Sequence, residues 1–206
     1  MRARAIIAAA VVAVAMTLTG CGASRPAATD MVATDIASEG KPLIVYFSHA
    51  GDNYLVGNVD TGNTAIVARQ IAEMTGGDTF EIKTSRYDGK TKRELRGISK
   101  EESEKGELPE YEGDVDVSGY KVIFIGGPIW HGTYPRVVFT FMRRHDLNGK
   151  TIVPFATSEG SGLGRTVEDV EGAYPRAKVV GAFSIKGHKV RGDKASVEAW
   201  IRGMGY

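Results

Sequence analysis

The sequence predicts an α/β protein, a three-layer α/β/α sandwich built on a mostly parallel five-stranded sheet. Short apolar, β-rich runs alternate along the chain with segments of helical periodicity, which is the pattern of repeated β-α units. One of these runs, residues 120–125, is apolar at nearly every position. Such a run is expected of a central parallel strand that is covered by helices on both faces. The 206 residues suffice for one domain with a hydrophobic core.

Five segments have the composition of buried or half-buried strands. Each is rich in β-branched or aromatic residues and is bounded by glycine or polar residues. Parallel strands that follow one another through a helix take right-handed crossovers, so we expect helices on both faces. The predicted strands are residues 43–47, 78–84, 120–125, 151–156 and 178–185.

Five helices are expected after these strands. The first carries apolar residues at helical spacing and stops at Gly76-Gly77, a common helix end. The third starts at Pro135, since proline is tolerated in a first turn. Residues 88–118 are charged, so we expect them to be solvated, whereas Trp200 lies at the spacing of a core residue. The predicted helices are residues 65–75, an exposed 93–103, 135–146, 165–172 and 194–204.

Three unusual loops, residues 48–64, 126–135 and 157–164, follow the predicted strand ends. The first loop carries hydrogen-bond donors that suit a phosphate, the second carries an aromatic plane, and the third carries small residues with free N–H groups. In parallel α/β sheets, ligands bind beyond the carboxyl ends of the strands, near a switch in strand order. Together the loops predict a site for a planar, phosphorylated ligand.

The residues Thr61-Gly62-Asn63-Thr64 open the first predicted helix. A helix N-terminus presents unpaired N–H groups and about half a positive charge, which together favour an anion. Gly62 allows a close approach, and Asn63 and Thr64 add side-chain donors. The loop lacks both G-x-G-x-x-G and G-x-x-x-x-G-K-[ST], so neither nucleotide fingerprint applies. An ordinary strand-to-helix turn, capped by Asn or Thr, is the alternative interpretation.

Combined, these motifs resemble the flavodoxin family. Its members follow the first strand with a Ser/Thr-x-Thr-Gly-Asn-Thr loop, which is matched here by Ser48-His49 and residues 61–64, with residues 50–60 inserted between them. Residues 126–135 match Gly-x-Pro-Ile-Trp-x-Gly-Thr-x-Pro, and residues 154–162 match Pro-Phe-x-Thr-Ser-x-Gly-Ser-Gly, both typical of a flavodoxin-like subgroup. The similarity covers residues 43–206.

The resemblance implies strand order 2-1-3-4-5, a short-chain form, bound FMN, and electron transfer without a chemical substrate. By position, the residues that would hold the phosphate are Ser48, His49, Thr61, Gly62, Asn63 and Thr64. The residues that would flank the isoalloxazine are Pro128, Ile129, Trp130, His131 and Gly132. Those that would face its other side or its pyrimidine edge are Thr157, Ser158, Gly160 and Ser161.

Some residues depart from the family pattern. His131 and Glu159 stand where an aromatic residue and glycine are expected. Tyr54 in the insertion either stacks on the flavin or is a mobile loop aromatic. His145 and His188 have no cysteine or carboxylate constellation around them in the sequence, so we expect both at the surface.

The N-terminal residues resemble a bacterial lipoprotein signal. Arg2 and Arg4 precede an apolar run, residues 5–18, that is too short to span a membrane, and Leu18-Thr19-Gly20-Cys21 follows. We therefore expect a signal peptide over residues 1–20, a lipid on Cys21, a flexible tether over 21–40 and the folded domain over 41–206, with the protein anchored outside the cytoplasm. An uncleaved anchor is the alternative, with the same location. Cys21 is the sole cysteine, so no disulfide and no cysteine-based metal site is expected.

Three functions compete. The net charge of +1 gives no indication of nucleic-acid binding. A lipid-tethered FMN electron carrier with a redox partner protein is favoured over an NAD(P)H-dependent quinone or FMN reductase of the same fold. The third is a binding module without flavin. Oxidation of NADH or NADPH with a quinone would separate the first two, and failure to take up FMN would indicate the third.

Overall fold

The main sheet is parallel and has the predicted strand order. The computed structural model describes residues 35–206. Its strands are β1 (Leu43–Tyr46), β4 (Asp78–Glu81), β5 (Val122–Pro128), β6 (Thr151–Ser158), β7 (Lys178–Val179) and β8 (Phe183–Lys186). They pair in the order β4-β1-β5-β6, and β7 and β8 both pair with β6. With β7 and β8 together in the place of the fifth strand, the order 2-1-3-4-5 is confirmed.

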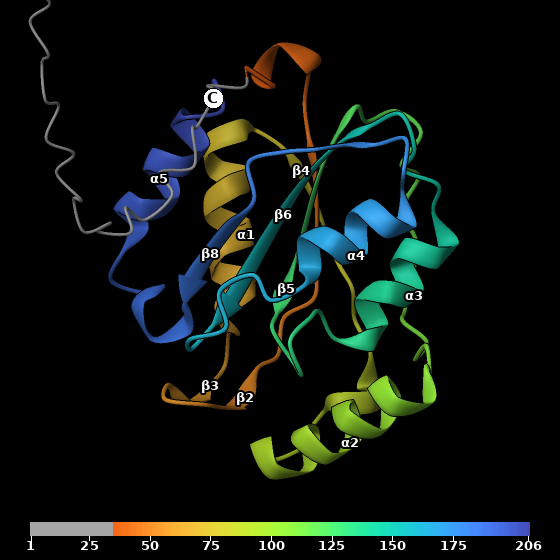
Figure 1. Ribbon diagram of the computed structural model, residues 1–206. Coiled ribbons are helices and arrows are strands. Elements are labelled where there is room, and N and C mark those ends of the chain that lie inside the picture. Colours follow the sequence, from red (N-terminus) through yellow and green to blue (C-terminus); the bar gives the residue numbers. More distant parts are fainter. Residues whose placement is uncertain (1–34) are drawn as a thin grey trace, which may run out of the picture. The chain divides into compact units, whose positions relative to one another are not determined.

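Helices cover both faces of the sheet, which makes the three-layer sandwich (Figure 1). The helices α1 and α5 pack on one face, and α3 and α4 pack on the other, while α2 lies beyond the carboxyl ends of the strands. The α-helices are α1 (Asn63–Thr75), α2 (Lys92–Lys105), α3 (Arg136–Arg144), α4 (Thr166–Ala173) and α5 (Lys194–Arg202). The short 3-10 helices are η1 (Ala37–Glu39), η2 (Ser85–Tyr87) and η3 (Gly187–Lys189).

Burial on both faces explains why the central strands are continuously apolar. In β1, Leu43 and Val45 belong to the cluster that includes α3, whereas Ile44 and Tyr46 belong to the cluster that includes α1 and α5. Successive side chains of a strand point to opposite faces, so each layer receives every second residue. Burying a large aliphatic side chain contributes roughly 1.5–3 kcal/mol.

The fifth strand is not continuous as predicted. It breaks at Gly181, which has a φ of 59° and whose carbonyl accepts a 2.6 Å hydrogen bond from Nε1 of Trp200. A Cβ at Gly181 would lie 2.6 Å from the sulfur of Met204, so the last helix and the residues after it pack directly on this backbone. Trp200 is 7% exposed and stacks on Phe183, which confirms it as a core residue.

The charged segment 88–118 is wrongly predicted as uniformly solvated. Glu102 of α2 is 0% exposed, and its carboxylate accepts hydrogen bonds from Nε of Arg86 and from the hydroxyl of Tyr87, both at 2.9 Å. Burial, and then the Glu102 charge, raise the pKa of Tyr87, so its hydroxyl stays protonated and donates. The sequence of α2 does not reveal that Glu102 is buried, because its partners Arg86 and Tyr87 come from η2, outside the helix.

The insertion and the N-terminal segment are the remaining parts of the chain. Residues 51–59 form an antiparallel hairpin of β2 (Gly51–Asn53) and β3 (Gly57–Val59).

The predicted signal peptide, Cys21 and the tether up to residue 34 lie outside the described residues. The end of that predicted tether packs on the fold, since Ile36 is buried and its N–H donates to the carbonyl of Met204 at 3.0 Å. Within residues 35–206, no helix is long and apolar enough to cross a membrane.

Candidate functional site

The three loops singled out in the sequence meet at the carboxyl edge of the sheet (Figure 1). The hydroxyls of Thr64 and Thr157 are hydrogen bonded at 2.8 Å, which joins the first loop to the third. The N–H of Ile129 donates to the carbonyl of Thr157 at 3.0 Å, which joins the second loop to the third. The edge is therefore one connected surface rather than three separate loops.

The start of α1 has the properties of an anion site. Gly62 is the N-cap residue, and a Cβ there would lie 2.3 Å from Oγ of Ser48 and 2.4 Å from the carbonyl oxygen of His49. This contact lets Oγ of Ser48 accept a 3.0 Å hydrogen bond from the N–H of Ala65. Among the described residues, the N–H groups of Asn63 and Thr64 have no hydrogen-bond partner. Unpaired N–H groups at a helix N-terminus bind anions.

The His49 ring lies next to Trp130, with the centres of the two rings 6.2 Å apart. Its Nε2 is buried and has no partner among the described residues. Burial lowers the pKa of His49, so the ring is uncharged at neutral pH. It therefore offers a hydrogen bond to a ligand but no positive charge.

A cavity of about 360 Å³ lies beside the start of α1, and we call it the ring cavity. Its lining combines residues of all three loops with two from the inserted hairpin and one from η3: Asn53, Tyr54, Asn63, Pro128, Ile129, Trp130, Thr157, Ser158, Glu159, Gly160, Ser161 and Gly187. The Trp130 indole is held edge-to-face by Phe47 at 5.6 Å and by Tyr87 at 5.1 Å. A fixed aromatic plane and a helix N-terminus at one cavity suit a ligand with both a flat ring and a phosphate.

A tight turn presents the aromatic loop. His131 and Gly132 have φ values of 51° and 83°, and the N–H of Trp130 donates to the carbonyl of Thr133 at 2.8 Å. Glycine adopts this conformation freely, whereas for His131 it carries a cost. The Gly132 carbonyl accepts a 2.8 Å hydrogen bond from the N–H of Arg165, which fixes one end of the turn.

A second cavity of about 380 Å³, the side cavity, adjoins the ring cavity. The residues that line both are Asn53, Tyr54, Ile129, Trp130 and Ser161. His49, His131 and Gly132 line the side cavity but not the ring cavity, and so do Lys92 and Arg96 of α2. Tyr54 is 65% exposed at the tip of the hairpin, so the insertion forms part of the wall of both cavities.

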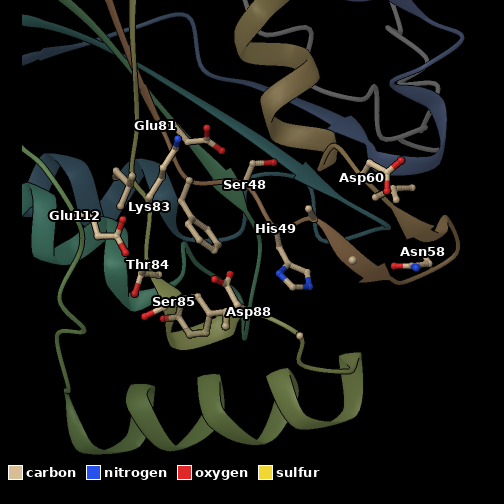
Figure 2. A pocket seen from close by; sticks show the side chains of 17 residues that line it. Ser48, His49, Asn58, Asp60, Glu81, Lys83, Thr84, Ser85, Asp88 and Glu112 are labelled. Atoms are coloured by element: carbon tan, nitrogen blue, oxygen red, sulfur yellow. The ribbon is translucent and has the colours of Figure 1, made fainter.

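Figure 2 shows the side chains that line a third cavity, of about 530 Å³, with Ser48 and His49 among them. Its carboxylates are those of Asp60, Glu81, Asp88 and Glu112. These negative charges repel a phosphate, so this acidic cavity is excluded as the phosphate site although it is larger than the ring cavity. Among residues 35–206, no group of three or more histidine, cysteine or acidic side chains could hold a metal ion.

Sequence reasoning missed the segment that follows β8. Arg191 donates from Nη1 to Oδ1 of Asn63 at 2.7 Å and from Nη2 to the carbonyl of Thr61 at 2.8 Å. His188 contacts Glu159 through its N–H at 2.9 Å and its Nδ1 at 2.5 Å. No motif signals these contacts, because the partners are far apart in the chain.

The two histidines expected at the surface differ from each other. The His188 side chain is 41% exposed but is paired with Glu159. The expectation for His145 is wrong, since its side chain is only 10% exposed and lies against Phe141, with ring centres 4.3 Å apart. His145 does not line the ring cavity, and its ring contacts Tyr111 and Asp114 instead.

The chain matches a family model and several solved structures. Residues 41–204 match the family model described as flavodoxin. A Bacteroides eggerthii protein provisionally named a flavoprotein is 29% identical over 81% of this chain and 98% of its own, with a TM-score of 0.60. A similarly named Bacteroides uniformis protein is 27% identical over 79% of this chain and 98% of its own, with a TM-score of 0.59.

A Lactobacillus acidophilus flavoprotein solved in complex with FMN shares the fold, with a TM-score of 0.57 at 20% identity, over 78% of this chain and 97% of its own. No curated protein matches the sequence. The family model spans most of the chain, and its limits agree with the folded residues. The chain therefore belongs to the flavodoxin family and has the flavodoxin-like fold of flavoproteins.

Proposed function

We propose that this protein binds FMN and carries electrons at the outer face of the membrane, to which a lipid on Cys21 tethers it. The chain belongs to the flavodoxin family, and FMN is the cofactor of that family. One observation carries the proposal. The start of α1, where the N–H groups of Asn63 and Thr64 have no partner among the described residues, adjoins the same cavity as the indole of Trp130, since Asn63 and Trp130 both line it. A single molecule with a phosphate and a planar ring therefore meets both.

The residues present fit FMN at both of its ends. Asn63, Thr64 and the neutral His49 would hold the phosphate, while Ser48 keeps the start of α1 in place through Ala65. Trp130 would lie against the ring, and the small residues of 157–161 would leave space at its other side. When bound, FMN supplies one-electron and two-electron chemistry, and the protein tunes it by burial and fixed dipoles.

Uptake of FMN tests the proposal directly. The purified domain, freed of bound flavin, is expected to take up one FMN per chain, with a shifted visible absorption spectrum and quenched flavin fluorescence. Reduced protein should then pass electrons to an acceptor protein without consuming a small substrate. A protein that stays colourless with excess FMN would instead be the flavin-free binding module.

The side cavity supports a reductase as a second candidate. It adjoins the ring cavity across Tyr54 and Trp130. Arg96 gives it a positive charge, whereas the charge of Lys92 is paired with that of Asp52 at 3.0 Å. A second planar, anionic substrate is the kind of molecule it would accept. Steady-state oxidation of NADH or NADPH with a quinone, faster than free FMN allows, would favour the reductase over the carrier.

The lipid tether predicts a simple change of location. Cys21→Ser removes the thiol that would carry the lipid. The variant is expected to leave the membrane fraction or to remain unprocessed, whereas the wild-type protein stays with membranes after a high-salt wash. Cell fractionation with immunoblotting measures both. Wild-type protein found in the cytoplasm with its N-terminal methionine intact would contradict the tether.

A further inference from the structure

The segment Gly187–Arg191, which we call the clasp, contacts two residues that line the ring cavity, Asn63 and Glu159. Arg191 donates hydrogen bonds to Asn63 and Thr61. The N–H and ring of His188 contact the carboxylate of Glu159. The clasp is thus a fourth segment of the site, contributed by the chain between β8 and α5.

We infer that Arg191 is a phosphate-binding residue of the flavin site, a role that rests on the proposed binding of FMN. Its guanidinium lies at the N-terminal end of α1, 2.7 Å from Oδ1 of Asn63 and 2.8 Å from the carbonyl oxygen of Thr61. Both acceptors are neutral, so the two bonds fix the position of the group without cancelling its charge. Arginine suits this role because its planar fork matches phosphate geometry.

The charge of Arg191 remains available. Within residues 35–206, no carboxylate lies within 4.0 Å of its guanidinium nitrogens. An arginine has five N–H donors, and the contacts with Asn63 and Thr61 use only part of them. The side chain therefore retains both charge and donors for an anion at the start of α1.

The ring cavity itself lacks a compensating charge. Among the described residues, its lining includes the carboxylate of Glu159 but no lysine or arginine. A phosphate monoester carries about −1.5 to −2 charges at neutral pH, and the helix N-terminus offsets only about half a charge. His49 is neutral. Arg191 is the cation that the geometry brings to this end of the site.

Packing and hydrogen bonds position the clasp beside the start of α1. A Cβ at Gly187 would lie 2.5 Å from Nδ2 of Asn63 and 2.8 Å from Oε1 of Glu159, so the clasp backbone packs directly on both side chains. The N–H of Val190 donates to the carbonyl of Gly187 at 3.2 Å, which closes the turn. A cation that is positioned before binding loses little conformational entropy when the anion arrives.

Arg191→Gln separates charge from shape, because glutamine can still donate to Asn63 or Thr61. We expect the dissociation constant for FMN to rise on the order of tenfold or more, as for loss of a charge-assisted contact. The dissociation constant for riboflavin, which has no phosphate, should change less than about twofold. Arg191→Lys keeps the charge and should recover part of the FMN affinity. Fluorescence titration at two salt concentrations measures all of these.

Lys189→Gln is the matched control, since it removes one positive charge from an exposed side chain in the same clasp. It should leave both dissociation constants unchanged. Salt should weaken FMN binding by the wild-type protein more than by Arg191→Gln. Equal losses of FMN and riboflavin affinity in Arg191→Gln, or no loss at all, would overturn the assignment of Arg191. Failure of the wild-type protein to bind either flavin would overturn the proposed function instead.

Discussion

Gly62→Ala is expected to weaken FMN binding at least about a hundredfold. The new Cβ would lie 2.3 Å from Oγ of Ser48 and 2.4 Å from the carbonyl oxygen of His49, so the start of α1 has to move away from β1. That movement breaks the bond between Ser48 and the N–H of Ala65 and redirects the N–H groups of Asn63 and Thr64. Losing two hydrogen bonds to a charged phosphate costs about 3–6 kcal/mol. Isothermal titration with FMN measures the loss.

Gly172→Ala is the matched control for this substitution. Gly172 lies in α4, outside the three loops, and a Cβ there would meet no atom within 4 Å. We expect it to change FMN affinity by less than about threefold, since no packed contact is disturbed. Wild-type affinity in Gly62→Ala, with circular dichroism confirming a folded protein, would show that the phosphate does not bind at the start of α1.

Glu102→Ala should have the largest effect on stability, lowering the free energy of unfolding by about 2–4 kcal/mol. The substitution leaves the buried hydroxyl of Tyr87 without its acceptor and removes the 2.9 Å bond from Arg86. It also opens a cavity where the side chain was fully buried. Urea denaturation at neutral pH measures the difference. Because Tyr87 also packs against Trp130, the variant is expected to bind FMN less tightly.

Glu107→Ala provides the comparison, because the same Arg86 also contacts Glu107, at 3.1 Å. The Glu107 side chain is 44% exposed, and exposed ion pairs contribute only about 0–1 kcal/mol. The two variants therefore remove one partner each from a single arginine, one buried and one solvated. Similar losses of stability in both would contradict the structural role of the buried carboxylate.

The sequence alone determined the fold class and the three loops that meet at the carboxyl edge of the sheet. Continuous apolar runs indicate strands buried on both faces, and the strand predicted over residues 120–125 overlaps β5, which starts at Val122 and continues to Pro128. The first helix, predicted over residues 65–75, begins two residues earlier, at Asn63, and ends at Thr75 as predicted. These features are readable because each depends on neighbours within a few residues, through backbone conformation and the alternation of buried side chains.

Only the tertiary structure decided how distant residues complete the site. Arg191 reaches Asn63 and Thr61 across 128 and 130 positions, and Glu159 meets His188 across 29. The tip of the inserted hairpin reaches the ring cavity in the same way, through Tyr54. No local pattern encodes such contacts, because they depend on where packing of the helices on the sheet brings the loops that connect them. From the sequence alone, Arg191 is only a charged residue in a loop, whereas the fold places its charge at the start of α1.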